Sequence, residues 1–156
     1  MKEAIANLGV FNLIIIFVII LLAFFIGSLS YTKAFKVKNK IVEEIEKDKG
    51  YFTDITEPAV EDWLSEIGYR MNTGFNSYQC PLETYNGING TVVNTSSDYQ
   101  YCVYKFDSCE GKITDKKKCS IHYRVVAYMY FDVPIINNLV KIPVKGETVS
   151  ITTLDS

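Results

Sequence analysis

Residues 8–29, LGVFNLIIIFVIILLAFFIGSL, contain no charged side chain. As an α-helix, such a run would rise about 33 Å at roughly 1.5 Å per residue. The hydrocarbon core of a bilayer is about 30 Å thick, so the run is long enough to cross it. A retained transmembrane helix is the favoured interpretation. The alternatives are a cleaved signal peptide, for which Ser28 and Ser30 offer a small-x-small pattern, and a buried core helix.

This run divides the chain into unequal parts. We expect a short N-terminal tail over residues 1–7, a transmembrane helix over 8–29, an amphipathic helical extension over 30–50, and an α+β head domain over 51–156. Membrane lipid is therefore the first expected partner. The side chains expected to anchor the chain in the membrane are Leu13, Ile16, Val18, Ile20, Leu22, Phe24 and Ile26.

The extension continues the helical pattern beyond the apolar run. Its residues 31–50 contain no helix breaker before Gly50, and glutamates and lysines alternate along one side. Apolar residues recur at spacings of three and four, which indicates one buried helix face; they are Ala34, Val37, Ile41 and Ile45. We predict a single helix of about 40 residues. The alternative is two helices that are broken near Gly27 and Ser28.

A second helix is predicted over residues 56–68, TEPAVEDWLSEIG. Thr56 or Asp54 would cap its start, Pro58 suits its first turn, and Gly68 would end it. The apolar residues fall at i, i+3, i+4 and i+7, which makes one face for packing in the head. These packing residues are Val60, Trp63, Leu64 and Ile67.

From Tyr69 onwards the pattern is typical of β-structure. Residues 81–98 are rich in Asn, Gly, Ser and Thr, and we predict turns around one short strand at 91–93. Further strands are predicted at 99–106, 120–132 and 139–154, the last with a turn at 145–147. The fold class is therefore α+β: a long N-terminal transmembrane and amphipathic helix, followed by a small antiparallel-sheet head domain with disulfides.

All four cysteines lie in the head: Cys80, Cys102, Cys109 and Cys119. An even number of cysteines beside an export signal indicates disulfides. Of the three possible connectivities we favour Cys109–Cys119, which would close a hairpin loop, together with Cys80–Cys102. Four reduced thiols in a cytoplasmic domain are the alternative. A zinc site is a weaker one, because the close Cys-x₂₋₄-Cys pairs of structural zinc sites are absent.

The charges that flank the apolar run favour the opposite topology. Lys33, Lys36, Lys38 and Lys40 follow the run, whereas only Lys2 and the amino terminus precede it. By the positive-inside rule the head would face the cytoplasm. We give the cysteines more weight and expect a single-pass cell membrane protein with an extracytoplasmic C-terminal domain.

Composition and motifs argue against several classes of function. The net charge of −2 does not favour nucleic acid as a partner. We find no motif for a catalytic, cofactor-binding or metal site, so we expect no enzyme activity and no cofactor. The single histidine, His122, lies in mid-strand and is expected to be structural. Two Asn-x-Ser/Thr sequons begin at Asn89 and Asn94.

Three pieces of sequence resemble a known family. They are the helix exit SYTKAFKVKNKIVEEIEKDKG, the short helix followed by IGYR and the pair Cys80-Pro81, and the ending YRVVAYMYFDVPIINNLVKIPVKGET. With the N-terminal apolar helix, this order resembles type IV-like pilins and pseudopilins, in particular the TadE-like minor pilins of Gram-positive bacteria. The resemblance implies a membrane-anchored structural subunit of a pilus-like filament or secretion assembly, which contacts other pilin-like subunits through its N-terminal helix.

The apolar run lacks the glutamate that type IV pilins carry near the start of the mature chain. The resemblance therefore implies a minor or priming subunit rather than a major pilin. The alternative is a single-pass extracytoplasmic binding or accessory protein with no filament role.

Overall fold

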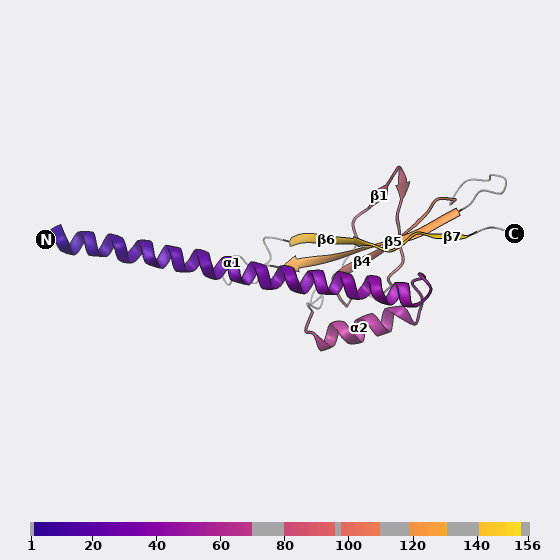
Figure 1. Ribbon diagram of the computed structural model, residues 1–156, viewed down its shortest axis with the longest axis horizontal. Coiled ribbons are helices and arrows are strands. Elements are labelled where there is room, and N and C mark those ends of the chain that lie inside the picture. Colours follow the sequence, from indigo (N-terminus) through magenta and orange to yellow (C-terminus); the bar gives the residue numbers. More distant parts are fainter. Residues whose placement is uncertain (1, 70–79, 96–97, 110–118, 131–140, 154–156) are drawn as a thin grey trace.

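The computed structural model describes residues 2–69, 80–95, 98–109, 119–130 and 141–153. One very long helix projects from a small head made of a second helix and an antiparallel sheet (Figure 1). The elements are α1 (Lys2–Lys47), α2 (Thr56–Glu66), β1 (Thr84–Tyr85), β2 (Ile88–Asn89), β3 (Thr91–Val92), β4 (Tyr101–Asp107), β5 (Cys119–Tyr130), β6 (Lys141–Glu147) and β7 (Ile151–Thr153). The predicted α+β class is confirmed.

Helix α1 is continuous through 46 residues, so the alternative of a break near Gly27 and Ser28 is wrong. The hydroxyl of Thr32 donates to the carbonyl of Ser28, within the helix. At its far end the N–H of Gly50 donates to the carbonyl of Ile45, 2.8 Å away, and Lys49 and Gly50 have positive φ. This left-handed end stops the helix and turns the chain towards α2.

The N-cap position of α2 is Ile55, which makes no side-chain cap hydrogen bond, so neither Thr56 nor Asp54 caps the helix as we predicted. Thr53 Oγ1 accepts from the N–H of Thr56, and Thr56 Oγ1 accepts from the N–H of Thr53, a reciprocal pair. Both hydroxyls also donate to Asp48 at the end of α1. The helix ends at Glu66, two residues before Gly68, whose positive φ closes it as expected.

The sheet is antiparallel throughout and is built around β5. Strands β3, β4, β5 and β6 follow one another in space, and β7 also pairs with β5, beyond the end of β6. The turn predicted at 145–147 is wrong, because these residues belong to β6 and pair with residues 124–126. Gly146 fits in the strand because α1 comes so close that a Cβ there would collide with the side chain of Lys38. The strand is interrupted later, where Thr148 bonds to both backbone groups of Tyr123.

The segment from 81 to 95 contains more β-structure than the single strand we predicted. β1 and β2 form a hairpin whose two turn residues, Asn86 and Gly87, both have positive φ. This is the turn geometry that matches strand twist in tight hairpins. β3 lies at residues 91–92, inside the predicted strand.

Helices cover one face of the sheet and the β1–β2 hairpin covers the other. Residues on opposite faces of β5 belong to different core clusters: Tyr123 and Val125 pack towards α1 and α2, whereas Val126 and Tyr128 pack towards the hairpin. Because both faces are covered, α1 and the hairpin are fixed to the same central strand. Residues 131–132, 139–140 and 154 of the predicted strands lie outside the described residues.

Candidate functional site: an exposed apolar helix and the head that it carries

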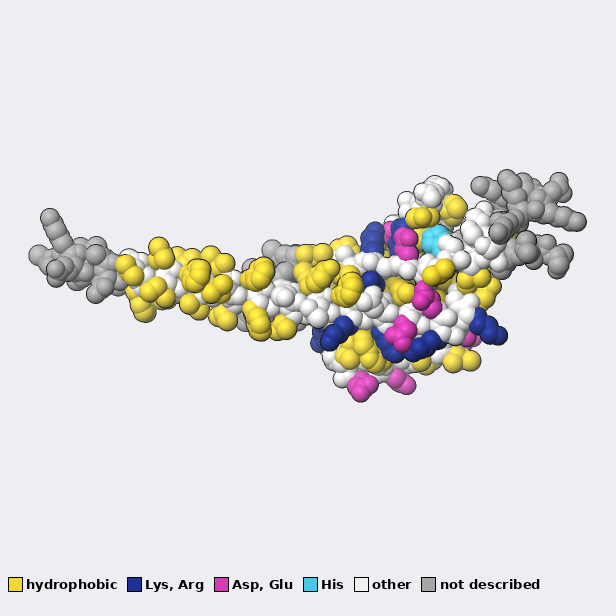
Figure 2. Space-filling model, viewed as in Figure 1, with side chains coloured by type: hydrophobic (Ala, Val, Ile, Leu, Met, Phe, Trp, Pro, Cys, Tyr) yellow, Lys and Arg dark blue, Asp and Glu magenta, His cyan; other side chains and the backbone are white. Residues whose placement is uncertain are grey.

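The N-terminal half of α1 exposes its apolar side chains on all sides. Figure 2 shows this half as a rod with hydrophobic side chains along the visible face. The predicted anchor residues Leu13, Ile16, Val18, Ile20, Leu22 and Phe24 are 45–78% exposed, whereas Ile26 is half-buried. Soluble surfaces rarely expose a continuous apolar patch of this size. Among the described residues, one helix is long and apolar enough to cross a membrane, and it is this one.

The C-terminal half of the same helix belongs to the core of the head. The predicted stripe Ala34, Val37, Ile41 and Ile45 is buried to 0–1% exposure. Its polar side is held by ion pairs one turn apart, with Lys40 and Glu44 at 2.7 Å and Lys47 and Glu43 at 2.7 Å. The anchor and the head are therefore joined by an uninterrupted helix whose second half is itself part of the folded domain.

The packing residues predicted in α2 all lie against this core. Val60 and Leu64 are fully buried, and Trp63 and Ile67 are partly buried at its edge. A polar contact that the sequence did not suggest fixes the start of α2. The buried carboxylate of Glu57 accepts from the N–H and the hydroxyl of Thr95, both at 2.7 Å. This contact ties the chain after β3 to the helix.

Asn94 acts as a substitute for a strand residue. Its Oδ1 accepts from the N–H of Val103 at 2.9 Å, and its Nδ2 donates to the carbonyl of Tyr101 at 3.3 Å. The side chain thus extends the ladder at the edge of β4 beyond the end of β3. Because Nδ2 is engaged with the backbone, the folded head does not offer Asn94 as a glycan acceptor, whereas Asn89 is exposed.

Two disulfides join the cysteines in the favoured pairing. Cys80 bonds to Cys102, with Cα atoms 5.8 Å apart, and Cys109 bonds to Cys119, with Cα atoms 5.5 Å apart. The first ties the hairpin side of the head to β4. The second joins the residues that leave β4 to the start of β5. No thiol is left free, and such bonds are typical of domains outside the reducing cytoplasm.

A charged and aromatic cluster holds the hairpin to the sheet. Arg124 on β5 contacts Glu83 at 3.1 Å and Glu147 at 2.6 Å. Its guanidinium also lies over the rings of Tyr85 and Phe106, about 5 Å from each centroid. The hydrogen bond from Lys145 is the largest cause that holds the pKa of Glu83 below its usual value. The sequence did not reveal this cluster, because its members come from four separate segments.

His122 lies next to this cluster, in mid-strand as predicted. Its ring stacks on Phe106, with centroids 5.1 Å apart, and meets the edge of Tyr85 at 4.8 Å. Burial lowers the pKa of the imidazole, and its Nε2 is buried without a hydrogen-bond partner among the described residues. A small pocket of about 140 Å³ opens here, lined by Tyr85, Asn86, Ile88, Phe106, Ser108, Ser120 and His122.

The described part of the chain contains no group of three or more His, Cys, Asp or Glu side chains placed to hold a metal ion. Comparisons with protein-family models, with curated proteins and with solved structures found no match for this chain. The geometry of the helix and of the head is therefore the basis for any functional conclusion.

Proposed function

We propose that this protein is a membrane-anchored structural subunit of a pilus-like or secretion assembly. The exposed half of α1 lies in the membrane and packs against apolar helices of like subunits, and the head is displayed outside the cell. The observation that carries the proposal is the continuity of α1. Its first half is an apolar surface without partners in the described chain, and its second half is buried in the head.

A continuous helix matters for such a role because it transmits position. In a flexible tether the head would move independently of its anchor. Here α1 runs unbroken from its exposed half into the core of the head. Packing between the exposed halves of neighbouring subunits would therefore also set the spacing and orientation of their heads. The order of anchor, extension and cystine-bearing head is the order for which the sequence resembles TadE-like minor pilins.

The proposed topology follows from the cystines. Both disulfides favour an oxidising compartment, whereas the lysines after the apolar run favour a cytoplasmic head. We give the disulfides more weight, because both pairs of cysteines are bonded in the folded head and Cys102 is fully buried in the packing under the hairpin. A charge bias only reflects the path of insertion.

Topology and assembly are tested in the same cells. A membrane-impermeant thiol reagent, applied before and after reduction, should label the head of intact cells only after reduction. A benzophenone amino acid at position 17, on the exposed half of α1, should cross-link the protein to pilin-like subunits in the membrane. The same group at position 149, on the head, is the matched control. Free thiols that react only after the cells are opened would refute the extracytoplasmic head.

The small pocket beside His122 favours a second candidate function. An accessory or binding protein would use this hollow to hold a side chain or small molecule, and it would need no contact between anchors. Cross-linking at position 17 separates the two. Adducts with lipid alone, and none with another subunit, would favour the accessory protein, whereas recovery of the chain in a sheared filament fraction would favour the structural subunit.

A further inference from the structure

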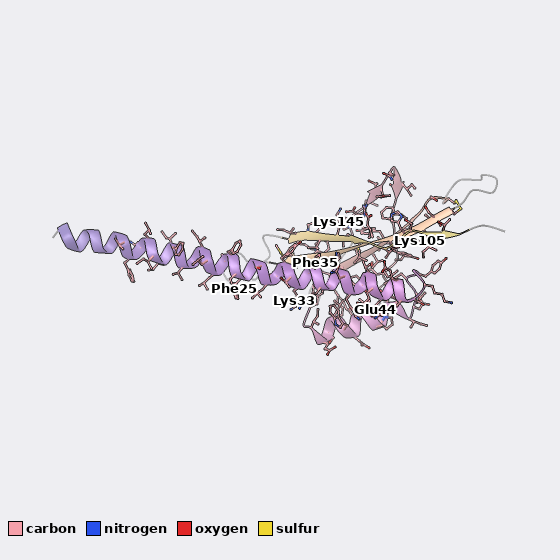
Figure 3. All side chains as sticks on the ribbon, in the orientation of Figure 1. Phe25, Lys33, Phe35, Glu44, Lys105 and Lys145 are labelled. Atoms are coloured by element: carbon pink, nitrogen blue, oxygen red, sulfur yellow. A yellow bond between two sulfur atoms is a disulfide. The ribbon has the colours of Figure 1, made fainter. Side chains whose placement is uncertain are left out.

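The end of the head nearest the exposed half of α1 carries lysines and exposed apolar side chains. They surround the point where α1 enters the head. Figure 3 shows Phe25 on the bare part of the helix, and Lys33 and Phe35 where the helix enters the head. Leu29, Tyr31 and Phe35 are 42–57% exposed, and Ile142, near the start of β6, is 41% exposed. We call this surface the proximal rim: Leu29, Tyr31, Lys33, Phe35, Lys36, Lys141 and Ile142.

Three contacts place the two sides of the rim at the same level. Lys33 Nζ donates to the carbonyl of Gly68 at 2.7 Å. The next residue, Tyr69, donates from its hydroxyl to the carbonyl of Tyr128 and accepts from its N–H, at 3.2 and 3.0 Å. Lys141 Nζ in turn lies 4.2 Å from the centre of the Tyr128 ring. Lys33 and Lys141 therefore lie on the two flanks of the same end of the head.

The length of the uncharged helix sets the depth of the rim. The 29 residues from Ala4 to Thr32 carry no charge and are helical in α1. At roughly 1.5 Å per residue they extend about 44 Å, which matches the 40–45 Å of a bilayer with its headgroup layers. Lys33 then lies at the outer edge of the headgroups, and Leu29 and Tyr31 lie within them. Phe35 and Lys36 follow Lys33 within one turn of the continuous helix, and the contacts described above hold Lys141 and Ile142 at the same end of the head.

We propose that the proximal rim is a lipid-binding surface that rests in the headgroup layer and holds anionic lipid phosphates through its lysines. This inference depends on the membrane-anchored part of the proposed function and not on the filament. Tyrosine at this depth is typical of a membrane interface, and its neighbouring lysines attract anionic headgroups. Glu66 at the end of α2 and Asp98 before β4 are acidic side chains at this end of the head, and the three rim lysines outnumber them.

The rim also gives the lysines after the apolar run a role that does not depend on topology. Lys33 and Lys36 would be retained as ligands for lipid phosphates on whichever side the head lies. The presence of these lysines beside an extracytoplasmic, disulfide-bonded head, which the positive-inside rule does not favour, then has a physical explanation. The head would be held upright on the membrane by contacts around the helix, rather than by the helix alone.

The depth of the rim is tested with the full chain in vesicles. A benzophenone amino acid is placed in turn at positions 17, 35, 142 and 149, and adducts with lipid are measured by mass spectrometry. Positions 17, 35 and 142 should form lipid adducts. Position 149 should not, although Val149 is 75% exposed, because it lies beside Glu46 near the far end of α1. Adducts at 17 without any at 35 or 142 would refute the rim and leave the anchor intact, whereas no adduct at 17 would refute both.

The lysines are tested by lipid retention. The full chain is extracted from vesicles of phosphatidylcholine and phosphatidylglycerol, and the phosphatidylglycerol that remains bound is counted by native mass spectrometry. The double variant Lys36→Gln, Lys141→Gln should bind phosphatidylglycerol about 25-fold more weakly and retain correspondingly less, since each lysine near a surface contributes about fivefold in affinity. The matched control, Lys49→Gln with Lys105→Gln, removes the same charge away from the rim and should retain the wild-type amount. Equal retention by the two variants would refute the anionic-lipid site.

Discussion

The two halves of α1 differ in composition and behave in opposite ways: residues 4–32 carry no charge, whereas residues 33–47 carry five lysines and three glutamates. Between Gly9 and Phe25 apolar side chains surround the helix and all are exposed, whereas beyond Thr32 a buried stripe is formed by Ala34, Val37, Ile41 and Ile45. The difference lies in both content and spacing, because charged residues flank the apolar stripe of the second half. An apolar residue on every side leaves a helix that only lipid or other helices can cover, while a stripe with charged flanks fits against a sheet.

The same contrast explains why a head this small can be held rigidly. The docked half of α1 contributes its stripe to a core that also contains α2 and one face of β5. Removing the head would leave that stripe exposed, and removing α1 would leave the sheet uncovered. The anchor and the head therefore cannot be treated as independent modules joined by a linker.

The largest effect should come from charge in the free half. The double variant Ile16→Arg, Ile20→Arg adds a penalty of about 6 kcal/mol for placing two arginines near the bilayer centre. We expect the protein to be lost from the membrane fraction after alkaline extraction. The matched control Ile16→Leu, Ile20→Leu should remain there, and an arginine variant that resists extraction would contradict a transmembrane role for this half.

A pair of identical substitutions compares the two halves directly. Ile41→Ala removes a fully buried side chain and should reduce the free energy of unfolding of the head by about 2–5 kcal/mol. Ile20→Ala, in the free half, should leave it unchanged within about 0.5 kcal/mol. Denaturant unfolding in detergent, followed by the fluorescence of Trp63, measures both. Equal losses would show that the free half is packed against the head.

The disulfides should stabilise the head and should not affect how the exposed half of α1 is held in the membrane. Replacing Cys109 and Cys119 by serine should cost about 3 kcal/mol in the chain-entropy model, and replacing Cys80 and Cys102 should cost a similar amount. Unfolding of the head measures the loss, and membrane extraction of the same variants should not change. If either double variant left the membrane fraction while its head stayed folded, the assignment of anchoring to α1 alone would be wrong.

The smallest expected effect is the dependence of the stability of the head on pH, which involves Glu83 and not the exposed half of α1. The folded-state pKa of Glu83 is lowered, so its ionic contacts stabilise the head above the usual glutamate pKa of 4.5 and are lost as the pH falls through the folded value. Glu83→Gln should therefore flatten the dependence of the melting temperature on pH below about 4.5. The control Glu46→Gln changes an exposed glutamate on α1 and should keep the wild-type slope. An unchanged slope in the Glu83 variant would show that the cluster around Arg124 adds nothing to stability.

Much of this fold could be predicted because its strongest signals are local. The spacing of Ala34, Val37, Ile41 and Ile45 predicted a buried stripe, and the residue pattern over 120–132 predicted the strand that the structure shows as β5. The errors occurred where a distant segment decides the local structure. Gly146 suggested a turn, but it pairs with Val125 of β5, and the start of α2 is held by Thr53 and Thr56, which both donate to Asp48 at the end of α1.

The candidate sites divide in the same way. The exposed apolar helix was visible in the sequence, because a run long and apolar enough to cross a membrane is a feature of local composition. The rim, the contact of Glu57 with Thr95, and the cluster around Arg124 were not visible, because each joins residues more than thirty positions apart. No local pattern records such a pairing.

By itself, the sequence determined that this chain has a long apolar helix, an amphipathic continuation and a β-rich, cysteine-bearing head, since each follows from hydrophobic periodicity and residue type within one segment. Only the tertiary structure decided that the helix runs unbroken into the core of the head and that a hairpin covers the second face of the sheet. It also decided that lysines from α1 and β6 lie at the same end of the head. Those features depend on side chains that come together only when the segments pack, and packing energies are set by contacts between segments rather than by order along the chain.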